Sequence, residues 1–278
     1  MRSRRALLGC ATASAGAALV AGAVVPGWLG RSAPLAAASG GAAPATPLSR
    51  PLTGAPIRAA ARLSCPTGNV VPLGSPTRAY AVTVSRRAVA YRRPGAGKIT
   101  AFGRLNVNGV PTVFLALAAR VDSSCRAVWY RVQLPLRPNG ASGWVRAAAV
   151  SARQVATRIL VDLSQRRVTL YRSGIPVLVA TAAIGSRATP TPTGRYYVNQ
   201  KLVAPDPLGA YGPAALGISA FSPVLKSWVQ GGPIAIHGTN EATLLGSAVS
   251  HGCIRVRNAD VLRLFKLVPT GTPVLIRM

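Results

Sequence analysis

From Leu63 to the C-terminus, short segments of alternating apolar and polar residues are interrupted every few residues by glycine, proline or asparagine. Residues 79–85 read AYAVTVS and residues 127–134 read AVWYRVQL. Alternation of this kind has the period of a β-strand, and turn residues at this spacing argue against long helices. The pattern therefore constrains this part of the chain to a mainly β fold.

The strand segments fall into two groups, which predict two domains. Residues 63–150 hold short strands separated by turns such as Pro94-Gly95, a pattern typical of a small barrel or sandwich. Residues 156–278 resume the pattern with the segments ILVDLS, RVTLYRS and PIAIHG.

One helix is expected near the C-terminus. Asn258 is a suitable N-cap, Asp260 lies in the first turn, where the helix dipole favours a negative charge, and Pro269 follows the end. One apolar side is formed by Val261, Leu262, Leu264, Phe265, Leu267 and Val268.

The N-terminus predicts export. Residues 1–5 are basic, residues 6–30 carry no charge and are rich in Ala, Val, Leu and Gly, and residues 1–40 together are typical of a signal peptide. Residues 3–8, SRRALL, resemble a twin-arginine signal, although an ordinary secretory leader has the same outline. Residues 6–30 are also long enough to remain as a membrane anchor. An Ala/Pro-rich linker is expected over 41–62.

The charge is strongly unbalanced. The chain has 33 Lys and Arg residues against 5 Asp and Glu, a formal net charge of +28. Such a surface adheres to polyanions, and because the working part is predicted to lie outside the membrane, anionic wall polymers are expected rather than nucleic acid. The alternative is that the arginines, which are scattered among Ala, Gly and Pro, reflect coding composition only.

Four cysteines are present. Cys10 lies inside the apolar leader and is expected to be inert. Cys65 and Cys125 fall in one domain, where an oxidising compartment permits a disulfide, although two independent thiols are the alternative. Cys253 is then left over, which makes it a candidate reactive thiol.

Both histidines of the chain lie close in sequence to Cys253. A thiol with a pKa near 8.5 is a weak nucleophile at neutral pH unless a neighbouring imidazole takes its proton. If SHGCIRV, residues 250–256, is extended, then His251, Cys253 and Arg255 share one face. His237 ends the apolar segment PIAIH and is expected to be held rigidly.

Glycines beside these residues complete a candidate acyl-transfer site. The backbone N–H groups of Gly252 and Cys253 are candidate donors to a developing oxyanion. The carbonyl group of Gly238 is a candidate to fix the tautomer of His237 in place of a carboxylate. A backbone carbonyl suits a chain that has so few acidic residues.

The motifs around His237 and Cys253 resemble those of a known family. IHGTN at 236–240, Gly246, SHGCIRV at 250–256 and Asp260 together resemble the signature of the YkuD-type L,D-transpeptidases. ILVDLSQRRVTLY at 159–171 resembles the opening hairpin of that domain, and ATPTPTGRYYV at 188–198 resembles its TPTG turn. The resemblance runs from about Arg158 to Met278 and implies a β-sandwich catalytic domain with one or two short helices.

The resemblance also implies a reaction on peptidoglycan stem peptides, without a cofactor or metal. The thiolate of Cys253 attacks the carbonyl of the third residue of a tetrapeptide stem, releases D-Ala, and passes the acyl group to the amine of a neighbouring stem, which makes a 3→3 cross-link. His237 is the general base and Gly238 lends its carbonyl. His251 and Gly252 shape the nucleophile's loop.

The resemblance also implies contacts to the substrate. Arg255 either meets a substrate carboxylate or forms a structural ion pair, and Ser250 and Thr239 are further candidates to bind substrate. Asp162 and Asp260 also match family positions and are interpreted as structural.

The N-terminal domain has its own resemblance. WYRV at 129–132 and RPNGASGWV at 137–145 resemble the end of bacterial SH3-like domains, which implies a small β-barrel. Such modules bind cell-wall peptides or act as spacers, and both interpretations stay open here.

Three other functions compete with the cross-linking enzyme. His237, Glu241, His251 and Cys253 could surround zinc, although their spacing matches no usual zinc pattern. The chain could be a wall-binding protein without activity, or a papain-like hydrolase or sortase. Within the family chemistry, the acceptor could instead be water, which trims D-Ala, or a protein that becomes attached to the wall.

Overall fold

The computed structural model describes residues 68–278, all within one compact unit, Leu63–Met278. The predicted signal peptide at 1–40, the linker at 41–62, Cys10 and Cys65 lie outside the described residues. Cys125 is disulfide-bonded, and Cys253 is a thiol rather than half of a disulfide. In the described part of the chain, no helix combines the length and the apolar character needed to cross a membrane.

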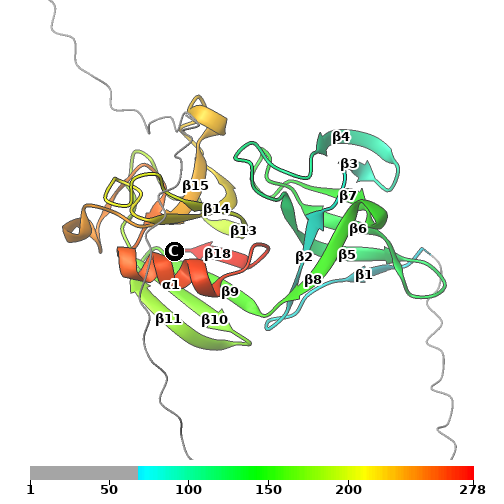
Figure 1. The fold of residues 1–278 in the computed structure, drawn as a ribbon, viewed down its shortest axis with the longest axis horizontal. Helices are drawn as coiled ribbons and strands as arrows, with labels where there is room; N and C mark the ends of the chain where they lie inside the picture. Colours follow the sequence, from blue (N-terminus) through cyan, green and yellow to red (C-terminus); the bar gives the residue numbers. More distant parts are fainter. Residues whose placement is uncertain (1–67) are drawn as a thin grey trace, which may run out of the picture. The chain divides into compact units, whose positions relative to one another are not determined.

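Residues 70–155 form the first sheet (Figure 1). Its path runs β4-β3-β7-β6-β5-β2-β8, and β1 pairs with β5. Alternate residues of its strands point inward, and Val82, Phe114, Val132 and Val145 are fully buried. The strands are β1 (Val70–Pro72), β2 (Ala79–Val84), β3 (Ala88–Arg93), β4 (Ala96–Phe102), β5 (Val113–Val121), β6 (Ala127–Gln133), β7 (Ser142–Arg146) and β8 (Val150–Val155).

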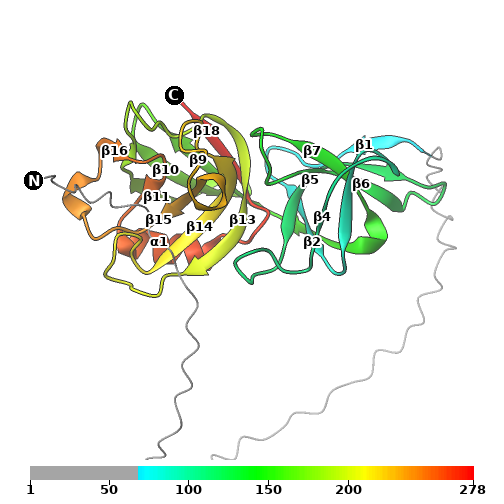
Figure 2. The same ribbon diagram turned by 90° about the horizontal axis from the view of Figure 1, so that it is seen from above.

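The C-terminal part contains a second eight-stranded sheet, in the order β11-β10-β9-β18-β13-β14-β15-β17 (Figure 2). Two short strands, β12 (Ile184–Gly185) and β16 (Ala248–Ser250), pair outside it. The eight strands are β9 (Thr157–Asp162), β10 (Arg167–Arg172), β11 (Ile175–Thr181), β13 (Gly194–Val203), β14 (Ala214–Phe221), β15 (Pro233–His237), β17 (Ile254–Arg255) and β18 (Pro273–Arg277). The mainly β prediction is confirmed.

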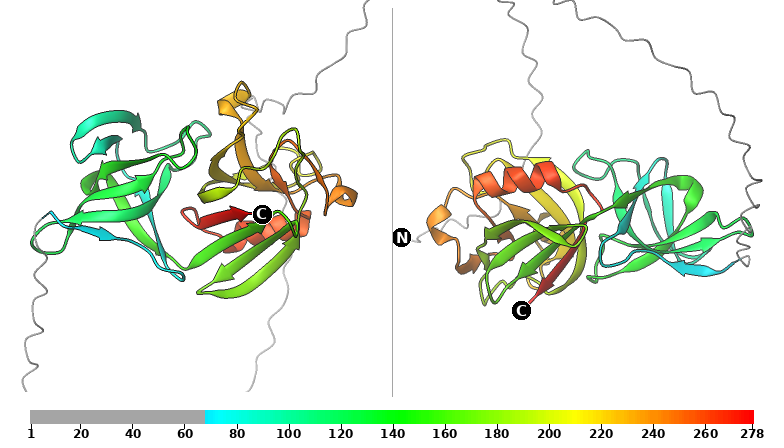
Figure 3. Two further views of the ribbon diagram at one scale, coloured as in Figure 1. Left: turned by 180° about the vertical axis from the view of Figure 1, so that it is seen from behind. Right: turned by 90° about the horizontal axis from the view of Figure 1, so that it is seen from below.

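The α-helix of the described residues, α1 (Asn258–Leu267), packs against β14 and β15 (Figure 3). Val261 and Leu264 are fully buried, as the apolar period predicts, whereas Leu262 is half exposed on the outer side. The predicted N-cap is wrong. Arg257 precedes the helix, no side chain caps it, and Asn258 is its first helical residue, with its carboxamide oxygen bonded to another segment.

The two sheets share buried contacts. Tyr197 of β13 is fully buried in a cluster with Ala81 and Val113 of the first sheet. Nε2 of Gln133 donates a hydrogen bond to the carbonyl oxygen of Arg195 at 2.7 Å. The catalytic candidates therefore lie on a sheet that is braced by the first one.

Candidate active site

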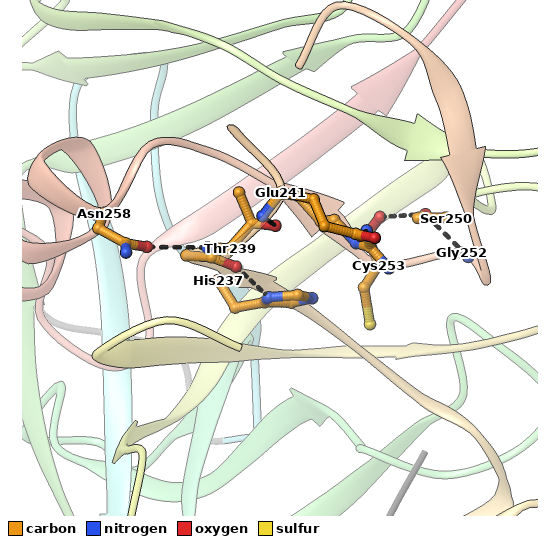
Figure 4. Close-up of polar contacts among 9 residues, drawn as sticks. His237, Thr239, Glu241, Ser250, Gly252, Cys253 and Asn258 are labelled. Atoms are coloured by element: carbon orange, nitrogen blue, oxygen red, sulfur yellow. Dashed lines mark hydrogen bonds and ion pairs between the residues drawn. The ribbon is translucent and has the colours of Figure 1, made fainter. Parts of the chain in front are cut away.

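Strand pairing brings His237 and Cys253 together. β15 and β17 run parallel, with Ile236 opposite Ile254 and His237 opposite Arg255. Both isoleucines are fully buried, so by alternation His237 and Arg255 lie on the opposite face, and Cys253 immediately precedes β17. Figure 4 shows the sulfur of Cys253 on the side of the His237 imidazole away from the dashed hydrogen bond to the ring.

An extended conformation over residues 250–256 would place the nucleophile on one continuous strand. The structure has no such strand. β16 ends at Ser250, β17 begins at Ile254, and Gly252 between them has a φ of 111°. This left-handed conformation favours glycine and turns the chain. His251 is exposed and lies against the ring of Trp228, with ring centroids 5.4 Å apart.

The imidazole of His237 is fixed by the backbone. Its Nδ1 lies 2.6 Å from the carbonyl oxygen of Gly238, the partner expected from the sequence, and the side chain is buried. Nδ1–H donates to this carbonyl in the neutral ring, which leaves Nε2 as the nitrogen that can accept a proton.

The pKa of His237 is lowered from 6.5 to about 4, and burial is the largest cause. The backbone carbonyl of Gly238 raises this pKa, the positive charge of Arg255 lowers it, and the backbone carbonyl of Tyr211 raises it. The imidazole is therefore neutral at pH 7, the state that a general base requires. The ring of Tyr211 also packs against it, with centroids 4.9 Å apart.

Ser250 organises the loop that carries the nucleophile. Its hydroxyl group donates to the carbonyl oxygen of Cys253 at 2.6 Å and accepts the N–H of Gly252 at 3.1 Å (Figure 4). Ser250 is buried, so its side chain serves the loop rather than the surface at which a substrate arrives. In this geometry the Gly252 N–H, a predicted oxyanion donor, is directed at Ser250.

The segment ATPTPTG, residues 188–194, holds the same loop through two threonine hydroxyl groups. Oγ1 of Thr189 donates to the carbonyl of Ser250, and Oγ1 of Thr191 donates to that of Gly252, each at 2.9 Å. Thr191 Oγ1 also accepts the N–H of Gly185 at 2.8 Å. Two hydroxyl groups thus fix both carbonyls that flank His251.

The remaining predicted site residues form a polar cluster beside the catalytic pair. Nη1 of Arg255 lies 2.5 Å from Oε2 of Glu241. Of the two roles considered for Arg255, a substrate contact and a structural ion pair, the ion pair is present. Thr239 is buried, and its Oγ1 accepts the N–H of Glu241 at 3.0 Å. Within residues 68–278, no three His, Cys, Asp or Glu side chains are grouped closely enough to hold a metal ion.

Sequence reasoning missed three neighbours of the site, namely Tyr211, Trp228 and Asn258. The two aromatic residues lie in irregular loops, where no periodic pattern marks them. The Trp228 segment is held at both ends by Arg137, whose Nη2 donates to the carbonyls of Ser222 and Gly231 at 2.6 and 2.7 Å.

Comparison with known proteins identifies this part of the chain. Residues 156–276 match the family model of the YkuD L,D-transpeptidase catalytic domain. YkuD of Bacillus licheniformis is 37% identical over 117 residues, 42% of this chain and 63% of that protein. YkuD of Bacillus subtilis is 35% identical over 119 residues, 42% of this chain and 64% of that protein.

The chain thus spans less than two thirds of the length of these two relatives. The solved catalytic domain of an E. faecium L,D-transpeptidase is 28% identical, with 44% of this chain and 96% of that chain covered and a TM-score of 0.33. The similarity of residues 156–276 to the YkuD family rests on the sequence matches and not on this alignment.

Proposed function

We propose that the protein is an exported L,D-transpeptidase that cross-links peptidoglycan stem peptides through a thioester on Cys253. The observation that carries the proposal is the pairing of a thiol with a buried, neutral imidazole whose Nδ1 is held 2.6 Å from the Gly238 carbonyl. That arrangement supplies a nucleophile and an oriented base without any carboxylate.

In the first half-reaction the sulfur of Cys253 bonds to the carbonyl carbon of the third stem residue. Nε2 of His237 takes the thiol proton as the bond forms and gives it to the nitrogen of D-Ala as the C–N bond breaks. Burial disfavours the charged form of this imidazole, which opposes a complete transfer of the thiol proton before attack. Proton transfer therefore accompanies attack.

In the second half-reaction an amine of a neighbouring stem attacks the thioester. Its proton passes to His237, the S–C bond breaks, an amide forms, and the thiol of Cys253 is regenerated. Water in place of the amine gives a tripeptide, and a protein amine gives attachment to the wall. The ion-paired Arg255 orders the site beside His237 in this proposal, rather than meeting a substrate carboxylate as an unpaired cation.

The proposal is tested with the purified protein, a disaccharide-tetrapeptide and mass spectrometry in ¹⁸O-labelled water, beside Cys253→Ala and an EDTA control. A cross-linked dimer with loss of D-Ala, absent in Cys253→Ala and unaffected by EDTA, is expected. Tripeptide carrying ¹⁸O and no dimer would identify a carboxypeptidase instead. No product from folded protein would overturn the enzymatic proposal and favour a wall-binding role.

The charge of the described residues supports retention on anionic wall polymers. All 5 acidic residues are described, and three of them, Asp122, Asp162 and Glu241, are already paired with arginines. Because 5 acidic residues are outnumbered by 33 basic ones, the excess positive charge cannot be neutralised within the chain. Release from isolated walls should rise steeply with salt, and release that salt does not affect would contradict the proposal.

The first sheet is proposed to be an SH3-like module that either binds wall peptides or acts as a spacer. A pull-down of residues 63–155 and of the whole chain with peptidoglycan separates the two, since a spacer adds no binding of its own.

A further inference from the structure

Asn258 links the start of α1 to the loop that follows His237. Its Oδ1 accepts a hydrogen bond from the backbone N–H of Thr239 at 2.8 Å, across 19 positions of sequence (Figure 4). The side chain is half-buried, and it makes no capping bond to its own helix. A residue at a helix start therefore directs its carboxamide to the catalytic loop.

The space around this carboxamide is kept open by two glycines. A Cβ atom on either Gly212 or Gly238 would overlap Oδ1 of Asn258. A Cβ on Gly212 would also lie 2.8 Å from the Cα of Gly238, so the two backbones touch. Three segments thus meet at one oxygen atom: the helix start, the loop after His237 and the loop that carries Tyr211.

The bond to Thr239 matters because of the peptide that it holds. The N–H of Thr239 and the carbonyl of Gly238 are the two ends of one planar peptide group. The N–H end donates to Asn258, and the carbonyl end lies 2.6 Å from Nδ1 of His237. Rotation of this plane would break both contacts together, and each bond polarises the group in the sense that strengthens the other.

We propose that Asn258 is a positioning residue for His237, which acts through the single peptide plane between Gly238 and Thr239. It holds the carbonyl that fixes the Nδ1–H tautomer and so keeps Nε2 directed at the thiol of Cys253. The inference rests on the general-base role proposed for His237. The carboxamide touches neither the thiol nor the substrate in this scheme.

The test uses Asn258→Leu, which keeps the approximate size and removes the acceptor. Because a misplaced base costs up to about a hundredfold in rate, kcat for D-Ala release should fall about tenfold to a hundredfold while KM changes less than about threefold. The ¹⁵N shifts of the imidazole should show a smaller population of the Nδ1–H tautomer.

Two further variants sharpen the test. Asn258→Asp keeps the acceptor, so it should retain the tautomer, and its negative charge should raise the pKa of His237. Gly212→Ala should displace the carboxamide and reproduce the Asn258→Leu tautomer shift without altering Asn258. Val268→Ala, in the core and away from the loop, is the control for lost stability alone.

The inference is overturned if Asn258→Leu keeps the wild-type tautomer and loses rate only as far as Val268→Ala does at equal stability. If Asn258→Leu does not fold, Asn258→Asp decides, and an unchanged titration of His237 refutes the coupling. The tautomer is read without substrate, so an inactive wild type would refute the proposed reaction and leave this contact to be judged separately.

Discussion

The lowered pKa of His237 leads to a quantitative prediction about its protonation and about the stability of the fold. The residue is 3% exposed, and burial lowers its pKa from 6.5 to about 4. At pH 6.5 roughly 0.3% of the imidazole should then be protonated, against about half for a histidine in water. The shift corresponds to about 3 kcal/mol in favour of the neutral ring in the folded protein.

The sign of the effect on stability follows from proton counts. Between pH 4 and pH 6.5 the unfolded chain holds a proton at position 237 that the folded protein does not hold. This group's contribution to stability is therefore complete above pH 6.5 and decreases by about 3 kcal/mol as the pH falls to 4. His237→Gln should lack this component.

The assay is simple because the chain contains only 2 histidines. Imidazole NMR titration of labelled protein gives two sets of resonances, and His251→Gln assigns them. Urea unfolding of wild type and His237→Gln at pH 7.5 and pH 4.5 then measures the linked stability. The acid limb of the acylation rate should follow the same group.

Titration of His237 between pH 6 and 7 would refute the argument from burial. So would equal changes in unfolding free energy with pH for wild type and His237→Gln. Either result would mean that water or a counter-charge reaches the ring, and that the thiol and the imidazole can form an ion pair before substrate binds.

Three further predictions address the surroundings of the site. Thr191→Val should slow acylation of Cys253 at least tenfold and lower the unfolding free energy by about 1–3 kcal/mol, because the buried N–H of Gly185 and carbonyl of Gly252 lose their hydrogen-bond partner. Thr191→Ser, which keeps the hydroxyl group, should behave as wild type. Arg255→Gln should raise the pKa of His237 in the NMR titration, because the arginine charge lowers it; an unchanged value would count against a direct electrostatic contact. Leu264→Ala should cost about 2–5 kcal/mol in urea unfolding, whereas Leu262→Ala, at a half-exposed position, should cost less than about 1 kcal/mol.

The strands could be predicted because alternation is a local property. The segments ILVDLS, RVTLYRS and PIAIHG all contain strands at their predicted places, and the buried side of α1 follows its apolar period at Val261 and Leu264. The residue types around Cys253 likewise indicate thiol chemistry before any fold is known, since an unbridged cysteine near two histidines has few other uses.

The same local reasoning failed where a non-local partner decides the geometry. Residues 250–256 alternate as a strand would, yet β16 ends at Ser250 and β17 begins at Ile254. Gly252 between them is left-handed, in a loop that the hydroxyl groups of Ser250, Thr189 and Thr191 hold. Asn258 has the chemistry of an N-cap, and the same carboxamide oxygen serves Thr239 instead.

The sequence by itself determined the β architecture, the helix and the candidate nucleophile and base, because side-chain period and residue chemistry are written in neighbouring positions. Only the tertiary structure decided which groups meet the imidazole of His237 and which loop contacts hold Cys253. Those contacts join segments that are distant in the chain, and a hydrogen bond depends on where its donor and acceptor lie in space rather than on their separation in sequence.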